Sequence, residues 1–212
     1  MKIYNISIKN DGYVYCKSCR YSAHDFLSES YTFSEGINML IGEIDSGNWA
    51  ISYLLSMYRH RPKDFVLFEQ PKVAVNDKMI SLKEFSKASC YMDKTDPLFS
   101  STKSVKKQIK QGLAHSKLDY SYDDIKNLFE LDSQRVERSL NKVGNEIFRA
   151  MAAIGLSYNK EVFCFPWLSH KQFEYYHGNL TILLEILEKL GKTVIIPVGM
   201  PATETTESME QQ

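Results

Sequence analysis

The sequence predicts an α/β fold organised around one strand–loop–helix unit, residues 37–55 (INMLIGEIDSGNWAISYLL). An apolar run that ends at Ile41 indicates a buried strand, and apolar residues recur at helical spacing from Ile51 onward. Between them lies a loop bounded by two glycines, Gly42 and Gly47. The rest of the chain alternates between strand-like and helix-like stretches, which is the pattern of an α/β protein.

The two glycines stand at the spacing of a phosphate-binding loop, G-x-x-x-x-G-K-[ST], in which backbone N–H groups surround the phosphates. In such a loop the next two residues are a lysine that neutralises phosphate charge and a serine or threonine that holds Mg²⁺. Here these positions hold Asn48 and Trp49, while Glu43 and Asp45 add negative charge inside the loop. We therefore predict a phosphate-binding loop in architecture but not in chemistry. The predicted degenerate nucleotide-binding residues are Gly42, Glu43, Ile44, Asp45, Ser46, Gly47, Asn48, Trp49 and Ala50.

Composition restricts the function classes. The chain has 212 residues, enough for the core of one domain, and its 26 Lys plus Arg balance its 26 Asp plus Glu. No net field therefore favours nucleic acid or an acidic membrane. We see no apolar leader and no membrane span, so we expect a cytoplasmic protein. Four cysteines are too few for a disulfide framework, and we interpret the Cys16-x-x-Cys19 pair as structural thiols rather than a zinc or redox site.

The remaining elements follow from periodicity and turn signals. Residues 94–141 have dense charge, few β-branched residues and apolar positions at helical intervals, which predicts a helical insertion. We expect a further helix over 146–156 and a helix through 180–187 that ends at Gly191. Residues 201–212 form a polar, acidic tail that we expect to be disordered. The expected strands are 3–8, 13–15, 31–33, 65–68, a strand and turn over 73–80 with its bend at 76–78, 90–92, 162–165, and 194–196, the last stopped by Pro197.

This order of elements resembles the nucleotide-binding domain of ABC transporters over residues 1–200. Residues 88–113, 147–167 and 180–199 resemble, in order and spacing, the family segments around the glutamine loop, after the signature motif and before the switch histidine. The resemblance implies a P-loop NTPase-like ABC ATPase fold. Its core is a RecA-like parallel sheet, joined by an antiparallel β-subdomain and by an α-helical subdomain at about residues 94–156.

Carried over residue by residue, the family motifs are substituted at their chemical positions. Pro166 and Trp167 stand where the Walker B Asp and the catalytic Glu belong, and neither can coordinate a metal or accept a proton. Asp93 takes the place of the glutamine-loop amide, and Gly199 that of the switch histidine. The match to the signature LSGGQ is Lys142, Val143, Gly144, Asn145 and Glu146, with valine in place of the serine.

The resemblance and its departures predict a pseudo-ATPase subunit with a structural or regulatory role in a transport complex. It implies a membrane permease as partner, together with a homodimer or another ABC ATPase subunit, at the inner face of the cell membrane. We expect no nucleic acid partner, no metal site and no catalytic residue. We also expect no cofactor; ATP with Mg²⁺ is the one that could still bind. Two alternatives stay open. An unconventional ATPase would need an Arg or Lys from elsewhere, such as Arg149 or Lys142, to reach the phosphates. A soluble scaffold or regulatory protein would have kept the fold but left transport.

Single residues also have plainer interpretations. Gly42 and Gly47 could be ordinary turn glycines of an unrelated α/β protein. Trp49 is expected to fill the core rather than to stack on a ligand, and Pro166-Trp167 is expected to pack. Tyr21 lies where the family places an aromatic residue that stacks on adenine. A cation site built from Glu43, Asp45 and Asp93 is the alternative to solvated loop charges.

Overall fold

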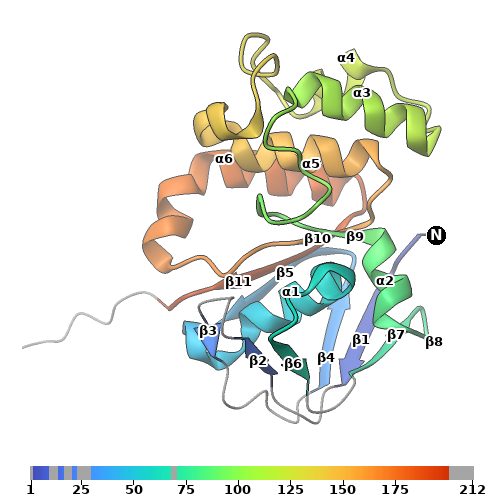
Figure 1. Cartoon of the computed structure of the whole chain (residues 1–212), viewed down its shortest axis with the longest axis vertical. Helices are drawn as coiled ribbons and strands as arrows, with labels where there is room; N and C mark the ends of the chain where they lie inside the picture. The colour runs from blue at the N-terminus through green and yellow to red at the C-terminus, as the bar shows by residue number, and fades with distance from the viewer. Residues whose placement is uncertain (1, 10–13, 17–20, 23–29, 68–70, 201–212) are drawn as a thin grey trace, which may run out of the picture.

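The computed structural model describes residues 2–9, 14–16, 21–22, 30–67 and 71–200. Its layers are a group of helices, a parallel sheet, a layer that contains helix α1 and the shorter α2, and an antiparallel sheet (Figure 1). The predicted α/β fold with a parallel core sheet, an antiparallel sheet and helices is confirmed. Within the described part of the chain, no helix has the length and apolar character needed to cross a membrane.

The parallel sheet forms the centre of the molecule. Its strand order is β5 (Gly36–Ile41), β11 (Thr193–Val198), β10 (Val162–Cys164) and β9 (Ser89–Tyr91). All residues of β9, β10 and β11 are buried, because helices cover both faces of these strands. β5 is an edge strand in the described part of the chain and leaves Ile37, Met39 and Ile41 partly exposed.

Helix α1 (Asn48–Met57) lies between the two sheets, and every one of its residues is buried. A helix that is apolar on all sides must be surrounded by protein. Its two serines satisfy their hydroxyls internally. Ser52 Oγ donates to the carbonyl of Phe165, just after β10, and Ser56 Oγ donates to the Ser52 carbonyl at 2.8 Å.

The antiparallel sheet closes the other side of α1. Its strand order is β4 (Ser30–Ser34), β1 (Asn5–Lys9), β7 (Lys72–Val75) and β8 (Lys78–Ile80). The predicted strand and turn over 73–80 are confirmed, and a second strand after the turn completes a hairpin: Asn76 and Asp77 both have positive φ, as a two-residue turn between antiparallel strands requires. A small third sheet pairs β2 (Val14–Cys16) with β3 (Tyr21–Ser22) and with β6 (Phe65–Leu67).

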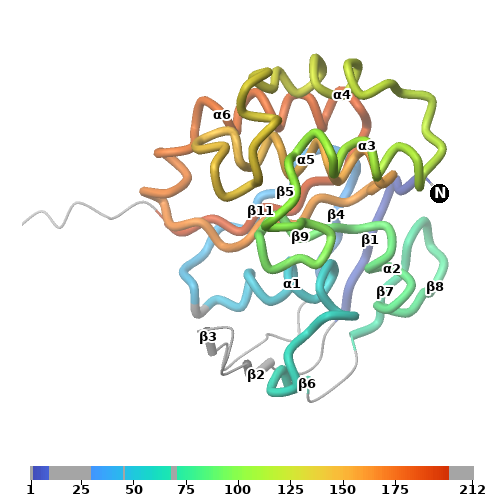
Figure 2. Tube along the Cα trace, turned by 45° about the horizontal axis from the view of Figure 1, so that its top comes forward, coloured from blue at the N-terminus to red at the C-terminus, as the bar shows by residue number. Residues whose placement is uncertain are grey.

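The helical part lies on the opposite face of the parallel sheet. It consists of α3 (Val105–Ser116), α4 (Tyr122–Leu128), α5 (Ile147–Ser157) and α6 (His170–Lys189), with short 3₁₀ turns at Leu140–Lys142 and Gly144–Glu146. Both views place α3 and α4 at the end of the molecule away from the antiparallel sheet (Figures 1 and 2). Gly112 of α3 lies against α5, since a Cβ there would fall 2.0 Å from Ser157 Oγ.

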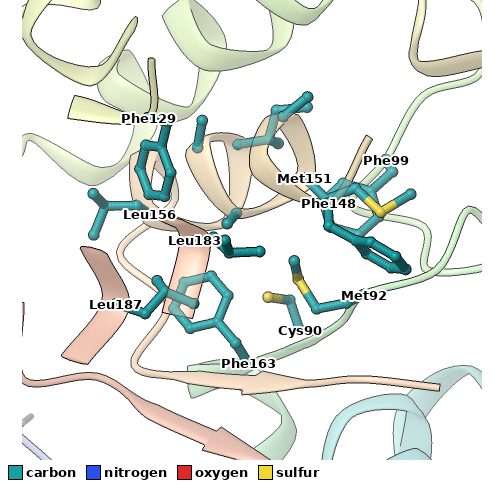
Figure 3. Packing of buried hydrophobic residues seen from close by; sticks show 14 of the residues in the cluster. Cys90, Met92, Phe99, Phe129, Phe148, Met151, Leu156, Phe163, Leu183 and Leu187 are labelled. Atoms are coloured by element: carbon teal, nitrogen blue, oxygen red, sulfur yellow. The ribbon is translucent and has the colours of Figure 1, made fainter. Parts of the chain in front are cut away.

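An apolar cluster joins the helices to the sheet (Figure 3). Cys90 of β9 and Phe163 of β10 point from the sheet toward Met151 of α5 and Leu183 of α6. α5 approaches closely because residue 155 is glycine: a Cβ there would lie 2.8 Å from the Phe163 ring. The cysteine thiol is fully buried and acts as an apolar side chain, and burial raises its pKa.

Three features differ from the sequence prediction. A short helix, α2 (Leu82–Ala88), precedes β9 and begins with a capping box between Ser81 and Glu84. α6 begins at His170, nearly three turns before the predicted region, after a second capping box at Ser169. β11 is not stopped by Pro197. It continues to Val198, because the proline keeps extended backbone and its carbonyl still accepts the Leu168 N–H at 3.0 Å. The predicted tail at 201–212 lies outside the described residues.

Candidate functional site

The loop after β5 connects strand and helix through one 3₁₀ turn, Ile44–Ser46. The Gly42 N–H donates to the Val198 carbonyl at 2.9 Å, which fixes the start of the loop to β11. Gly47 has φ 81°, a left-handed conformation that favours glycine, and immediately precedes α1. The strand–loop–helix geometry predicted from the two glycines is therefore present.

The inside of this loop is filled by its own side chains. A Cβ on Gly42 would lie 2.7 Å from Ser46 Oγ and 2.9 Å from Asn48 Nδ2, so both polar groups are folded onto the glycine. Asn48 is only 7% exposed. Ser46 Oγ is buried and has no hydrogen-bond partner among the described residues. Glu43 is exposed, and the side chain of Asp45 lies outside the described part of the structure.

Trp49 belongs to the core. Its side chain is 2% exposed and contacts Tyr53 and Phe65 edge-on, with ring centroids 6.3 Å and 6.5 Å away. These aromatic neighbours lie between α1 and the small sheet, and they hold the tryptophan away from solvent. The interpretation of Trp49 as a core residue is confirmed. The loop position that takes a hydroxyl for Mg²⁺ in a phosphate-binding loop is here a packing position.

Trp167 closes the carboxyl edge of the parallel sheet. It follows β10 and donates its indole N–H to the Gly42 carbonyl at 3.0 Å. A Cβ on Gly199 would lie 2.8 Å from its Cζ2 atom, so the indole also rests on that glycine. Leu168 adds a backbone link, since its carbonyl accepts the Gly199 N–H at 2.8 Å. The residues predicted at the Walker A, Walker B and switch positions thus meet at one edge. Pro166, beside the tryptophan, is half-buried.

The loop after β9 uses its carboxylates to hold itself. Asp93 Oδ1 accepts the Thr95 N–H at 2.9 Å and the Thr95 hydroxyl at 2.7 Å. Asp96 is buried and accepts the backbone N–H groups of Tyr91 and Leu98 at 2.7 Å and 2.9 Å. Burial raises the pKa of Asp96 above its ordinary value, although the two hydrogen bonds oppose that shift. Among the described residues, no group of three or more possible ligands could hold a metal ion.

The predicted signature residues lie in the helical part and are bound there. Val143 is buried, and Gly144 has φ 65°. Asn145 Oδ1 accepts from Arg135 at 2.8 Å, and Glu146 Oε1 lies 3.1 Å from the same guanidinium. These contacts make the segment a structural turn before α5. Lys142, on the preceding 3₁₀ turn, is exposed.

Arg149 is held in the same region. It is 8% exposed, lies 3.7 Å from Glu146 Oε1 and donates to the Glu130 carbonyl at 3.1 Å. Its contacts join the start of α5 to the end of α4. All its described partners belong to the helical part, so this guanidinium is engaged away from the loop after β5. The side chains of Tyr21 and Cys16, and residue Cys19, lie outside the described part of the structure.

Sequence reasoning missed two groups. The first is the buried hydrogen bond from the Ser52 hydroxyl to the Phe165 carbonyl. The sequence shows a polar residue within an apolar helix, but it does not show which group accepts its hydrogen bond. The second is a lysine-rich groove on α3, which comprises Ser104, Lys106, Lys107, Lys110, Gln111, Ala114 and Glu137. Its signal was visible, because residues 97–118 contain five lysines and no acidic residue.

The strands, the glycine loop and the inserted helices together define a nucleotide-binding-type α/β fold. No family model and no curated protein matches the sequence. Solved structures match its fold. A structure described as a putative ABC transporter (ATP-binding protein) from Pyrococcus furiosus aligns with a TM-score of 0.62 at 15% identity, over 94% of both chains. The chain therefore has the fold of ABC transporter ATP-binding domains.

Two further structures support the same fold. A bacterial Atm1-family ABC exporter with ATP bound aligns with a TM-score of 0.59 at 11% identity, over 93% of this chain and 35% of the exporter chain. A dimeric ATP-binding cassette in a post-hydrolysis state with ADP and phosphate also gives 0.59, at 12% identity, over 92% of this chain and 88% of that chain. At these identities the likeness concerns the fold.

Proposed function

We propose that this chain is an ABC-type ATP-binding-protein-like subunit that does not hydrolyse ATP efficiently and acts structurally or regulatorily in a transport complex. One observation carries the proposal. At the carboxyl edge of the parallel sheet, Asn48 is packed onto Gly42, and Trp167 is hydrogen-bonded to the same glycine. The positions that perform chemistry in this fold are thus occupied by side chains that contact the loop itself, at Gly42.

A magnesium-bound nucleotide does not fit this set of residues. A polyphosphate needs cations and free N–H groups around it, and its metal needs oxygen ligands. Here an amide replaces the lysine at Asn48, an indole replaces the metal-binding hydroxyl at Trp49, and the exposed Glu43 adds negative charge. Phosphoryl transfer depends on positioned charge, and loss of one such group costs about 3 kcal/mol of transition-state stabilisation. On this proposal the chain carries no catalytic residue.

The segment that matches the signature motif also supports the proposal. In the family that the sequence resembles, nucleotide is clamped between the loop of one subunit and the signature of another. Val143 is buried and Glu146 is ion-paired within the helical part, so this segment has no free hydroxyl or carboxylate to offer a partner's nucleotide. We propose a homodimer or a complex with another ABC ATPase subunit, together with a membrane permease, at the cytoplasmic face of the membrane. Neighbours described as an exporter and as a dimer support this assignment.

The test is isothermal titration of the full chain with ATP and Mg²⁺, in parallel with an Asn48→Lys variant. We expect no heat and no thermal shift for the natural sequence up to millimolar nucleotide. The variant separates two causes: binding gained by the lysine would show that the loop backbone is competent and that the missing cation is the reason. Micromolar binding by the natural sequence would overturn the proposal in favour of an unconventional ATPase.

Co-purification tests the transport setting. The chain, produced at its native level with an affinity tag, is expected to bring down an integral membrane protein from detergent extract. Recovery of the chain alone, or with soluble proteins only, would contradict the permease assignment and favour a scaffold or regulatory protein that has left transport. A tag-only extract provides the control.

A further inference from the structure

The outward side of α3 carries a shallow groove of about 430 Å³. Lysine side chains at Lys106, Lys107 and Lys110 make most of its rim, and Ala114 and Gln111 continue it along the helix. The opposite side of α3 is buried against α5 through Val105, Ile109 and Gly112. The groove therefore sits on a helix whose orientation is fixed by packing, rather than on a loop.

The cations in the groove are only partly compensated. Lys106 lies 2.6 Å from Glu137 Oε1, and this pair raises the pKa of the ammonium. Lys110 lies 5.4 Å from the Tyr122 ring centroid. Neither Lys107 nor Lys110 forms an ion pair with a described residue, and both side chains are exposed. On a chain without net charge, α3 is thus a local positive pole.

The spacing of these groups restricts the occupant. Lys107 and Lys110 are three residues apart, so they are neighbours on one helix face, about 5–6 Å apart at Cβ. Two carboxylates one helical turn apart would match them. Ala114 and the aliphatic stems of the lysines offer apolar contact beside that pair. Glu137 pairs with Lys106, so the positive charge that remains is that of Lys107 and Lys110, which suits two spaced carboxylates better than a continuous run of phosphates such as a nucleic acid strand.

We infer that the α3 groove is a docking site for an acidic amphipathic helix of a partner protein, with carboxylates one turn apart on Lys107 and Lys110 and an apolar residue on Ala114. The inference rests on charge complementarity and on the fixed geometry of α3. It is independent of nucleotide binding, because no residue of the groove lies at the loop after β5. It goes beyond the proposed function by assigning a second surface and the chemistry of what binds it.

The probe is a fluorescent helical peptide of about four turns, built from Glu, Ala and Leu with glutamates one turn apart. We expect micromolar binding to the full chain by fluorescence anisotropy, weakening as salt rises. A scrambled peptide of the same composition is expected to bind at least tenfold more weakly. A thiol cross-linker placed by an Ala114→Cys substitution should capture the ordered peptide and not the scrambled one.

Charge-reversal variants locate the site. The Lys107→Glu/Lys110→Glu variant is expected to lose tenfold or more in affinity for the ordered peptide. Lys83→Glu/Lys171→Glu changes net charge equally at exposed positions on α2 and α6 and is expected to lose less than twofold. Circular dichroism confirms that both variants are folded.

Three results would overturn the inference: equal binding of the scrambled peptide, equal losses in the two double variants, or tighter binding of a probe of another class. The last is tested by competition with single-stranded polyuridylate and with phosphatidylserine vesicles. Preference for polyuridylate would assign the groove to nucleic acid, and preference for the vesicles would assign it to a membrane surface.

Discussion

Helices α1 and α3 are similar in length but stand in opposite relations to the rest of the protein. α1 lies between two sheets with every residue buried, whereas α3 buries one face on α5 and presents lysines on the other. α1 starts at the loop where this fold performs its chemistry elsewhere, yet Asn48 and Trp49 are committed to packing. α3 has no such expected role, yet it presents Lys107 and Lys110, neither of which forms an ion pair with a described residue. Two helices of similar length in one chain therefore do different work: α1 stabilises the core, and α3 presents charged side chains to solvent.

Substitution of Trp49 tests the packing side of this comparison most strongly. Trp49→Ala removes a side chain that is 2% exposed and leaves a cavity against Tyr53 and Phe65. We expect the free energy of unfolding to fall by about 4 kcal/mol in urea denaturation. Lys107→Ala on α3 is the matched control and should change stability by less than about 0.5 kcal/mol. Similar losses in the two variants would show that α1 is not the more tightly packed helix.

Substitution of two helical glycines tests which helix faces are buried: Gly112 lies on the packed face of α3, and Gly178 lies on an open face of α6. Gly112→Ala on α3 would bring a Cβ within 2.0 Å of Ser157 Oγ, and we expect about 2 kcal/mol of destabilisation from overpacking. Gly178→Ala on α6 meets nothing within 4 Å. The second change should instead stabilise the protein by about 0.5–1 kcal/mol, because alanine favours helix. Thermal unfolding of both variants measures the two changes in stability. A loss of stability in both would contradict the assignment of Gly178 to an exposed helix face.

The indole of Trp167 links the strand ends through one hydrogen bond. Trp167→Phe keeps an aromatic ring but removes the donor to the Gly42 carbonyl, and we expect a loss of about 1 kcal/mol. Tyr175→Phe, at a residue 77% exposed, should be neutral and serves as the control. Amide hydrogen exchange should report faster exchange at Gly42 and Gly199 in the Trp167 variant. Unchanged exchange would mean that the indole does not hold this edge.

Substitution of Asp96 is expected to have the smallest effect on stability, and this effect appears as a change in how the free energy of unfolding depends on pH. Burial raises its pKa in the folded protein above the ordinary value of 3.8. The folded state therefore retains a proton that the unfolded state has lost, and stability falls as pH rises from 3.8 through the folded pKa. Asp96→Asn should lack this slope, whatever constant loss follows from its weaker acceptance of the Tyr91 N–H. Parallel slopes for the two proteins in urea titrations over this range would refute the assignment.

The sequence predicted the parts of the fold that follow from local pattern. Apolar runs located β10 and most of β11, and the Asn76-Asp77 turn located the β7–β8 hairpin. The glycine pair located the loop, and substitution of its motif residues is visible in the sequence itself. The start of α6 was misplaced, because residues 170–179 are mostly polar and carry little periodicity. The capping pairs at Ser81 and Ser169 were available signals that the periodicity analysis did not use.

The hydrogen-bond and ion-pair partners of the site residues could not be predicted, because these contacts join segments that are distant in the sequence. The hydrogen bond from Trp167 to Gly42 joins residues 125 positions apart. The pairing of Arg135 with Asn145 and Glu146, which fixes the signature-like turn, also requires the folded helical part. No local rule gives such partners. The lysine-rich stretch was visible in composition, but only the packing of α3 on α5 shows which lysines share a groove.

The parallel pairing of β5 with β11 has a consequence for how the chain folds. Asn38 and Val194, which touch through the Asn38 amide, are 156 positions apart. The central sheet therefore cannot close until nearly the whole chain is available, and closing so large a loop carries a substantial entropy cost. Residues 105–157, which contact one another locally, can form first. During synthesis we expect the helical part to become protease-resistant before β5 gains its neighbour, and Ile37, Met39 and Ile41 stay open to mispairing until then.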